Sequence, residues 1–184
     1  MRGRTTNESI AAYAGLADIL SATGRPVDFA PMGARAIRAD ELTPRSRQLL
    51  DHVDHMTERL RTASGGDLKL TVLREHSAAG EYSREILLTA ADGAILEFGV
   101  VRIMEQHLPP AVVHEIHRRE KPLGDILISH GVLRRVEPRW FFEFDETALP
   151  TRAMNARAGD GRLGIIHCNG EPAIQVLEVI PRSH

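Results

Sequence analysis

The chain has 184 residues, of which 42% are hydrophobic and 26% are charged, and its formal net charge at pH 7 is -2. This composition is ordinary for one globular domain with a substantial core, and it excludes a disordered chain. The basic residues are dispersed along the sequence, which argues against a nucleic-acid-binding face and against a polybasic membrane patch.

The cysteine content and the absence of long apolar runs indicate in which cellular compartment the protein is expected. Cys168 is the single cysteine, so an intrachain disulfide is excluded, and we interpret it as an inert small residue in a strand. No window approaches the roughly 18 apolar residues of a membrane span. The N-terminal residues lack the apolar run of a signal peptide. We therefore expect a cytoplasmic protein that does not contact a membrane.

The first 41 residues are predicted to form an extension ahead of the main domain. A helix is expected over residues 8–22, because apolar side chains recur there at helical spacing: Ile10, Tyr13, Leu16 and Leu20. Residues 24–41 contain prolines and glycines without a clean period, which is typical of a connecting segment. We therefore divide the chain into a helical extension and connector, 1–41, and a domain, 42–184.

A second helix is expected to begin at Thr43-Pro44, since threonine caps helices and proline is tolerated in the first turn. One continuous apolar stripe follows, made of Leu49, Val53, Met56 and Leu60. The residues that follow, Ser64-Gly-Gly-Asp67, are typical of a helix end.

Three strands are predicted next. Apolar alternation over residues 68–74 indicates the first strand, and residues 75–80 are expected to form a polar loop. The second strand runs to about Ala90, and Asp92-Gly93 forms a tight turn into the third strand, 95–103. The third strand is apolar on both faces, which is typical of a central strand.

Two short helices are expected after these strands. Pro109-Pro110 opens the first, and Lys121-Pro122 separates it from the second, which ends at Gly131. His114, His117 and Glu120 lie three residues apart on the first of these helices. We do not predict a metal site there, because no fourth ligand is evident and the segment is typical of an exposed face.

The C-terminal part is predicted to contain three more strands. Residues 136–145 carry an inward aromatic face formed by Trp140, Phe142 and Phe144. The loop over 146–160 is long enough to be a candidate lid. A closing hairpin follows, with strands at 163–168 and 173–180 joined by Asn169-Gly170. Strands joined by hairpins predict an α+β domain, with helices packed on an antiparallel β-sheet.

Two charged residues interrupt apolar strand faces. Arg84 shares a face with Tyr82, Ile86 and Leu88, and Glu178 shares a face with Ile174, Val176 and Ile180. A buried charge is costly unless it is paired or neutralised by a ligand. The pattern therefore fits either a buried Arg84–Glu178 ion pair or a cavity for a small anion, and the strand pattern alone does not decide between them.

Four segments in register resemble the chorismate pyruvate-lyases, which make 4-hydroxybenzoate. The segments are Asp54-His-Met-Thr-Glu-Arg-Leu60, Tyr82-Ser-Arg-Glu-Ile-Leu-Leu88, Lys121-Pro-Leu-Gly124, and Gly170-Glu-Pro172 followed by Glu178. The resemblance covers about residues 42 to 182. It implies a chorismate lyase-like fold, an antiparallel sheet that encloses a buried ligand cavity, with no metal and no organic cofactor.

The resemblance also implies roles for individual residues. Arg84 is expected to bind the ring carboxylate, together with backbone around Leu123 and Gly124. Glu178 is expected to face the ether or hydroxyl side of the ring and to donate a proton or a hydrogen bond there. Met56 matches an apolar residue that lines the cavity. The two catalytic candidates are thus Glu178 and Arg84.

The chain departs from the family pattern at two places. Many members carry an Arg-Arg-x-Arg run where this chain has Arg162-Leu-Gly-Ile165, and some carry an arginine where this chain has Val100. Chorismate has two carboxylates, so a second cation is expected near the site. Arg162, Arg102 and Arg135 are the candidates, and Arg162 is included with Met56, Leu123 and Gly124 among the predicted substrate-binding residues.

The predicted function is elimination of pyruvate from chorismate, which leaves an aromatic hydroxybenzoate, most readily 4-hydroxybenzoate. Two alternatives stay open. One is a related enzyme that acts on another cyclic carboxylic acid, and the other is a non-catalytic small-ligand-binding domain, since ligand-sensing domains of a bacterial repressor family share this fold. The extension is too short and too weakly basic for the DNA-binding winged helix that precedes those domains. The expected partner is a small carboxylate, and the sequence does not define the oligomeric state.

Overall fold

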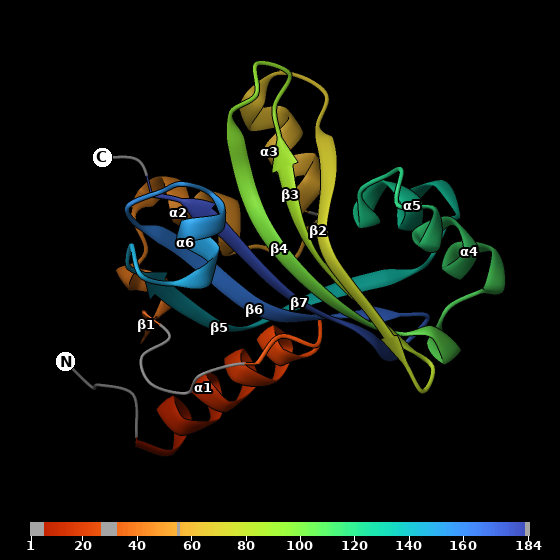
Figure 1. Cartoon of the computed structure of the whole chain (residues 1–184), viewed down its shortest axis with the longest axis horizontal. Helices are drawn as coiled ribbons and strands as arrows, with labels where there is room; N and C mark the ends of the chain where they lie inside the picture. The colour runs from red at the N-terminus through yellow and green to blue at the C-terminus, as the bar shows by residue number, and fades with distance from the viewer. Residues whose placement is uncertain (1–5, 27–32, 55, 183–184) are drawn as a thin grey trace.

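The computed structural model of the chain describes residues 6–26, 33–54 and 56–182. Its centre is a seven-stranded sheet in the order β1-β5-β6-β7-β4-β3-β2, in which every neighbouring pair is antiparallel (Figure 1). The strands are β1 Ala34–Ile37, β2 Lys69–Ala78, β3 Glu81–Thr89, β4 Ile95–Met104, β5 Arg134–Phe144, β6 Gly159–Cys168 and β7 Glu171–Pro181. This arrangement confirms the predicted α+β class.

Six α-helices and two short 3₁₀ helices are described along the same residues. The α-helices are α1 Thr6–Ser21, α2 Pro44–Leu50, α3 Met56–Ser64, α4 Pro110–Arg118, α5 Leu123–Ser129 and α6 Leu149–Ala153. The 3₁₀ helices are η1 Ala39–Glu41 and η2 Glu105–His107. The expected start of the second helix is confirmed, because the Thr43 side chain accepts a hydrogen bond from the Ser46 backbone N–H at 3.1 Å.

Helix α1 covers one face of the sheet (Figure 1). Its inward side chains pack on β4, β5, β6 and β7 in one buried cluster, which includes Ala12, Leu16, Ile19, Leu20, Phe98, Val100, Phe142, Phe144, Leu163, Leu177 and Val179. The predicted stripe is therefore correct at Leu16 and Leu20. It is wrong at Ile10, which is 62% exposed, because the helix turns a face centred on Leu16 toward the sheet.

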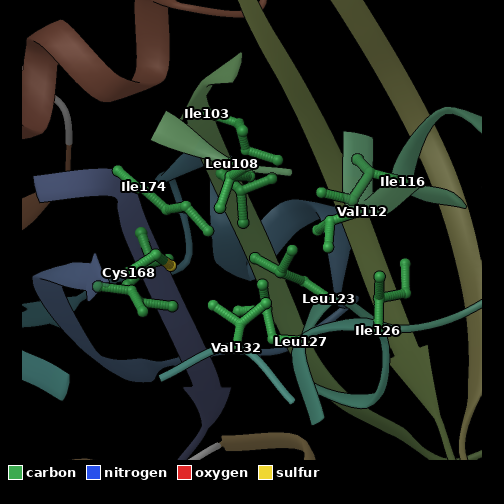
Figure 2. Close-up of a cluster of buried hydrophobic side chains, with 14 of the residues drawn as sticks. Ile103, Leu108, Val112, Ile116, Leu123, Ile126, Leu127, Val132, Cys168 and Ile174 are labelled. Carbon is green, nitrogen blue, oxygen red and sulfur yellow. The ribbon is translucent and has the colours of Figure 1, made fainter. Parts of the chain in front are cut away.

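The opposite face of the sheet is covered by helices α2 to α5, which form two separate apolar clusters. Helices α4 and α5 pack on one end of the sheet through the cluster drawn in Figure 2, which contains Val112, Ile116, Ile126, Leu127 and the buried Cys168. Helices α2 and α3 pack on the other end through Leu49, Leu50, Met56, Leu60, Ile86 and Leu88. A seam therefore lies between the two clusters.

The predicted continuous helix after Thr43 is instead two helices. Helix α2 ends at Leu50 and α3 begins at Met56, so Val53, which was expected inside the apolar stripe, is 65% exposed. The chain turns here because Arg162 donates to the carbonyl oxygens of Leu50 and His52, both at 2.8 Å. Those carbonyls are thereby satisfied by a side chain from the sheet rather than by helix continuation.

Two other predicted connections also differ. Strand β2 runs to Ala78, so the loop expected over 75–80 shrinks to a tight turn at Ala79-Gly80, where both residues have positive φ. The expected connector 24–41 contributes β1, which pairs with β5, and residues 27–32 of that connector lie outside the described residues. The sheet therefore has one more strand than the sequence pattern predicts.

The predicted lid over 146–160 is wrong. This segment contains α6, and Ala148 and Met154 are buried in the cluster under α1. The segment therefore packs on the α1 side of the sheet. Strand β5 is also apolar on both faces, since Phe141 is buried among the α2 and α3 side chains. The prediction of a single aromatic face on β5 missed this.

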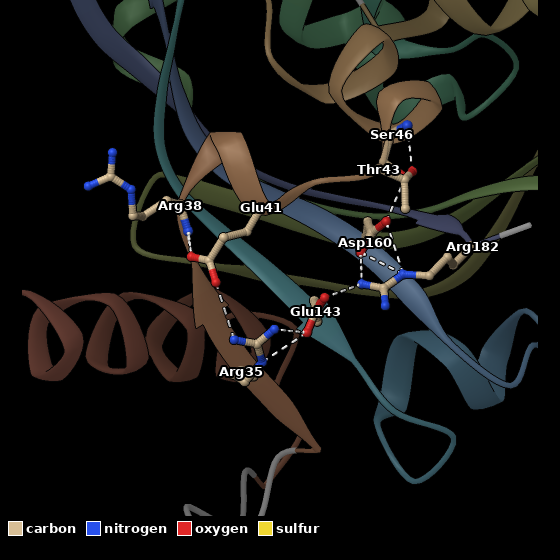
Figure 3. Close-up of polar contacts among 8 residues, drawn as sticks. All are labelled: Arg35, Arg38, Glu41, Thr43, Ser46, Glu143, Asp160 and Arg182. Carbon is tan, nitrogen blue, oxygen red and sulfur yellow. Dashed lines mark hydrogen bonds and ion pairs between the residues drawn. The ribbon is translucent and has the colours of Figure 1, made fainter. Parts of the chain in front are cut away.

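A chain of polar contacts joins one end of the sheet to α2 (Figure 3). Ser46 donates to the fully buried Asp160 at 2.6 Å, and Arg182 pairs with both Asp160 and Glu143. Arg35 on β1 also pairs with Glu143. These contacts fix β1, β5, β6 and the start of α2 relative to one another, and they hold the α2–α3 side of the helical layer in place.

Candidate functional site

A cavity of about 50 Å³ lies at the seam between the two apolar clusters. Residues of β2, β3, β4, β6 and β7 line it from the sheet, and α3, α5 and Pro122 line it from the helical layer. Its residues are Met56, Thr57, Leu70, Arg84, Ile86, Leu88, Glu97, Gly99, Val101, Pro122, Leu123, Gly124, Ile166, Val176, Leu177 and Glu178. Five of the six predicted site residues therefore meet here: Met56, Arg84, Leu123, Gly124 and Glu178.

Arg84 is the buried cation of this cavity, with 1% of its surface exposed. Its guanidinium donates to the carbonyl oxygens of Ile116 at 3.4 Å and Lys121 at 3.5 Å, and its Nε has no hydrogen-bond partner among the described residues. Burial lowers the pKa of Arg84. A guanidinium stays charged in proteins, so Arg84 is a buried cation. Its backbone hydrogen bonds are long, and Tyr82 and Glu75 attract it without forming an ion pair among the described residues.

The Arg84–Glu178 ion pair, one of the two interpretations of the strand pattern, does not form. Glu178 instead pairs with Arg162, whose Nε lies 2.5 Å from the glutamate Oε2. Arg162 is itself 1% exposed, and it faces Glu178 directly across β6 and β7. Glu178 thus lies on an apolar strand face as predicted, but its charge is paired, and Arg162 belongs to the site as its partner.

Glu97 is a buried acid that the sequence pattern did not single out. It is 3% exposed, and its Oε2 has no hydrogen-bond partner among the described residues. Burial and the neighbouring charge of Glu178 raise the pKa of Glu97 well above its ordinary value. The signal was available, because the Asp92-Gly93 turn sets Leu88 opposite Glu97 and thereby places Glu97 on the Arg84 face.

The departure at Val100 does not remove a cation from this cavity. Val100 points to the α1 side of the sheet, where it packs in the cluster that contains Phe98 and Leu177. The neighbouring Gly99 faces the cavity between Ile86 and Glu178. A side chain at position 100 of this backbone would therefore lie behind the sheet and away from Arg84.

Two of the three arginines considered as a second cation lie elsewhere. Arg102 pairs with Glu81 and Asp18 near α1. Arg135 pairs with Glu137 at the surface. Arg162 alone among these three lies beside the cavity residues, and it is already paired with Glu178. A second free cation for a dicarboxylate is therefore not present among these candidates.

A larger hollow of about 910 Å³ lies between α1 and the ends of β1 and β5. Its lining includes the exposed Ile10 and the arginines Arg35 and Arg182. Arg35 pairs with Glu41 and Glu143, and Arg182 pairs with Glu143 and Asp160. Among the described residues that line this hollow, no side-chain atom is both buried and without a hydrogen-bond partner. The smaller cavity, with its two unsatisfied buried ionisable groups, is therefore the better candidate site.

Other chemistry-bearing residues have structural partners. His117 contacts Glu105 at 2.6 Å, and the described residues contain no cluster of three His, Cys, Asp or Glu side chains that could hold a metal ion. Burial raises the pKa of the Cys168 thiol to about 11, which agrees with an inert residue. Among the residues that the structure describes, no helix is long and apolar enough to span a membrane.

Comparison with known proteins identifies the fold but not a family. No family model and no curated protein sequence matches the chain. The crystal structure of PhnF from Mycobacterium smegmatis superposes with a TM-score of 0.54 at 15% identity, over 71% of this chain and 64% of that one. The chain thus spans less than two thirds of the PhnF structure. A structure of the PhnF C-terminal domain matches with a TM-score of 0.46 at 14% identity, over 61% of this chain and 82% of that one.

At this level of identity the likeness to PhnF concerns the fold alone. It supports the arrangement of an antiparallel sheet with helices packed on it, which the sequence pattern predicted. The comparisons therefore identify the architecture that carries the cavity, and they leave its ligand to the chemistry of the residues that line it.

Proposed function

We propose that the chain binds a small carboxylate ligand in the cavity between α3, α5 and the sheet. The observation that carries the proposal is Arg84, a buried guanidinium with no carboxylate partner among the described residues. A ligand carboxylate would supply the bidentate acceptor that a guanidinium fork prefers. Binding would therefore offset the desolvation cost of burying this cation.

The character of the cavity supports an aromatic or otherwise cyclic apolar body for this ligand. The walls beside Arg84 are aliphatic, formed by side chains such as Ile86, Val101 and Leu123. Small-ligand sites are commonly apolar with a few placed polar groups. Non-catalytic binding is the function that we favour, because ligand-sensing domains share this fold and the likeness to PhnF is consistent with such a role.

Turnover of chorismate is the second candidate. In that reaction the ether C–O bond breaks, the neighbouring ring carbon loses its proton, and the released enolpyruvate takes up a proton to become pyruvate. Glu97 and Glu178 favour this candidate, because a carboxyl group with a raised pKa and a carboxyl group paired with Arg162 lie beside the cavity. In its protonated form, Glu97 would donate a hydrogen bond to the departing oxygen.

One experiment separates the two candidates. The purified chain is incubated with chorismate while pyruvate is followed by a coupled assay, and binding of 4-hydroxybenzoate is measured by calorimetry on the same preparation. The binding proposal predicts a calorimetric signal without pyruvate release above the rate of chorismate alone. Pyruvate and 4-hydroxybenzoate formed in equal amounts, and lost in Arg84→Met, would establish the lyase instead. Absence of both signals would contradict a carboxylate site of this class.

A further inference from the structure

Glu97 and Arg84 mark opposite ends of the cavity. On β4, Val101 lies opposite Arg84 on β3, and Glu97 lies opposite Leu88, so the two ionisable groups are four residues apart along the sheet. That separation corresponds to about 13 Å between their backbone positions. Both side chains line the cavity between these positions. A ligand held by Arg84 at one end therefore extends toward Glu97 at the other.

Gly99 keeps the space between the two ends open. It lies between Glu97 and Val101 on the cavity face of β4, opposite Ile86. A Cβ at this position would meet the Ile86 side chain at 3.1 Å and Glu97 Oε1 at 3.2 Å. The glycine thus leaves room for the Glu97 carboxyl group over the sheet, and it lets that group turn toward the ligand space.

Resting on the proposed carboxylate site, we propose that Glu97 is a specificity-determining residue: its carboxyl group donates a hydrogen bond to a ligand oxygen at the end opposite Arg84. Glu97 has a buried oxygen with no partner among the described residues, so its hydrogen-bonding capacity is available to a ligand. A protonated carboxyl group offers one O–H donor.

The surroundings of Glu97 explain why its pKa is raised. The negative charge of Glu178 raises the pKa of Glu97. Arg162 is the neighbouring cation, and it already pairs with Glu178 and donates to two backbone carbonyl oxygens. Two neighbouring carboxyl groups share one cation, so one of them is favoured in its neutral form. Glu178 takes the ion pair, and Glu97 is left as the donor.

This arrangement selects the chemical class of the ligand. The end near Glu97 favours a hydroxyl or carbonyl oxygen, which accepts from Glu97, and a hydroxyl could also donate to Glu178. A second carboxylate at this end would meet the charge of Glu178. A compound that lacks an oxygen there would leave the Glu97 donor buried and unpaired, which is costly. We therefore expect preference for a monocarboxylate with a distal oxygen.

The test compares 4-hydroxybenzoate with benzoate, which differ by this single oxygen. Dissociation constants for both are measured by calorimetry on the parent chain, on Glu97→Leu, which removes the donor, and on Glu97→Gln, which retains one. Glu85→Gln is the matched control, because Glu85 is an equally buried glutamate of the neighbouring strand that contacts Thr23 and Arg25 instead of the cavity. Circular dichroism establishes that each variant is folded.

We expect the parent to favour 4-hydroxybenzoate by at least about tenfold. Glu97→Leu should bring this ratio to about one while it still binds benzoate, and Glu97→Gln and Glu85→Gln should keep the ratio within about threefold of the parent. An unchanged ratio in Glu97→Leu would overturn the role of Glu97 and leave the carboxylate site standing. Failure of the parent to bind either compound would overturn the proposed function and, with it, this inference.

Discussion

Four ionisable residues define the candidate site. Arg84, Glu97, Arg162 and Glu178 lie on one face of the sheet, and only Arg162 and Glu178 satisfy each other by an ion pair. Burying a charge without a partner is unfavourable for folding. The two residues without such a partner, Arg84 and Glu97, are therefore the ones for which a ligand offers the largest gain.

The raised pKa of Glu97 predicts how the free energy of unfolding changes with pH. Its pKa is raised in the folded chain, so above the ordinary carboxyl pKa the folded state binds a proton that the unfolded state has released. The free energy of unfolding should therefore fall as pH rises toward the raised pKa. Glu97→Gln removes this titration and should gain on the order of 1–3 kcal/mol over the parent at pH 8, and much less at pH 4.5.

Urea denaturation of the parent and of Glu97→Gln at the two pH values measures this difference. Glu171→Gln, at an exposed glutamate of β7, is the control and should show no pH-dependent gain. A gain of equal size at pH 4.5 and pH 8 would mean that Glu97 carries no raised pKa in the folded chain.

At this scale the strand pattern predicted which residues are unusual but not their partners. The period-2 alternation placed Arg84 and Glu178 on apolar faces, and both line the cavity. It could not predict that Arg162 would pair with Glu178, because that contact depends on the register of β6 against β7. Glu97 was missed because the β4 residues around it were interpreted as a uniformly apolar strand.

Among the elements, α1 is fixed to the sheet by a buried acid on the face away from the cavity. Arg25, just after this helix, donates to both oxygens of Glu85 on β3 at 2.9 and 2.7 Å, and Thr23 donates at 2.8 Å. Burial acts to raise the pKa of Glu85, but the hydrogen bonds from Arg25 and Thr23 outweigh it and lower the pKa. The carboxylate is thus stabilised in its charged form where it is fully buried.

Loss of the Arg25 contact should destabilise the fold. Arg25→Ala leaves a buried carboxylate with one hydroxyl partner, and we expect a loss of about 2 kcal/mol at pH 7, less than for a fully buried pair because Arg25 is partly exposed. Since the folded-state pKa of Glu85 is lowered, its contribution is present above the ordinary carboxyl pKa and is lost as pH falls through the lowered value.

Urea denaturation at pH 7 and at acidic pH measures this effect. The difference between parent and Arg25→Ala should shrink as the solution is acidified. Arg38→Ala is the control, since Arg38 pairs with Asp40 at the surface and should cost little. Equal losses for the two variants at pH 7 would show that the buried contact does not anchor α1.

The sequence predicted the type of an element where local signals were strong. It did not predict the boundaries of elements whose ends depend on tertiary contacts. Thr43-Pro44 and Asn169-Gly170 act through local backbone preferences, so the helix start and the closing hairpin were predicted correctly. The break between α2 and α3 depends on Arg162, more than 100 residues away in the sequence. Strand β1 is short and is stabilised by pairing with β5. The local sequence pattern does not indicate such a long-range pairing.

In the whole molecule, the cavity is placed where two independently packed halves of the helical layer meet. The α4–α5 cluster and the α2–α3 cluster flank it, and Arg61 of α3 and Asp125 of α5 form an ion pair across the seam at 2.9 Å. The cavity holds about 50 Å³, whereas a cavity that binds benzene is about 150 Å³. Helices α3 and α5 must therefore shift apart to admit a cyclic ligand.

This geometry predicts where the ligand changes backbone protection. In hydrogen exchange with 4-hydroxybenzoate at saturation, the amides of α3 and α5 should exchange more slowly than in the free chain, because the ligand bridges the two halves. The amides of α6, which pack on the opposite face, serve as the internal control and should change little. Slower exchange confined to the amides of α1 and α6 would instead place the ligand in the hollow between α1 and the ends of β1 and β5.

The most direct test of the carboxylate site is calorimetric titration of 4-hydroxybenzoate into the parent chain and into Arg84→Met. Methionine keeps an apolar side chain of similar reach and removes the cation, so the variant should stay folded and its affinity should fall by about 2 kcal/mol or more, roughly thirtyfold. Equal affinities for the parent and Arg84→Met would contradict the account, because a buried guanidinium that does not contact the ligand leaves the proposed site without its anchor.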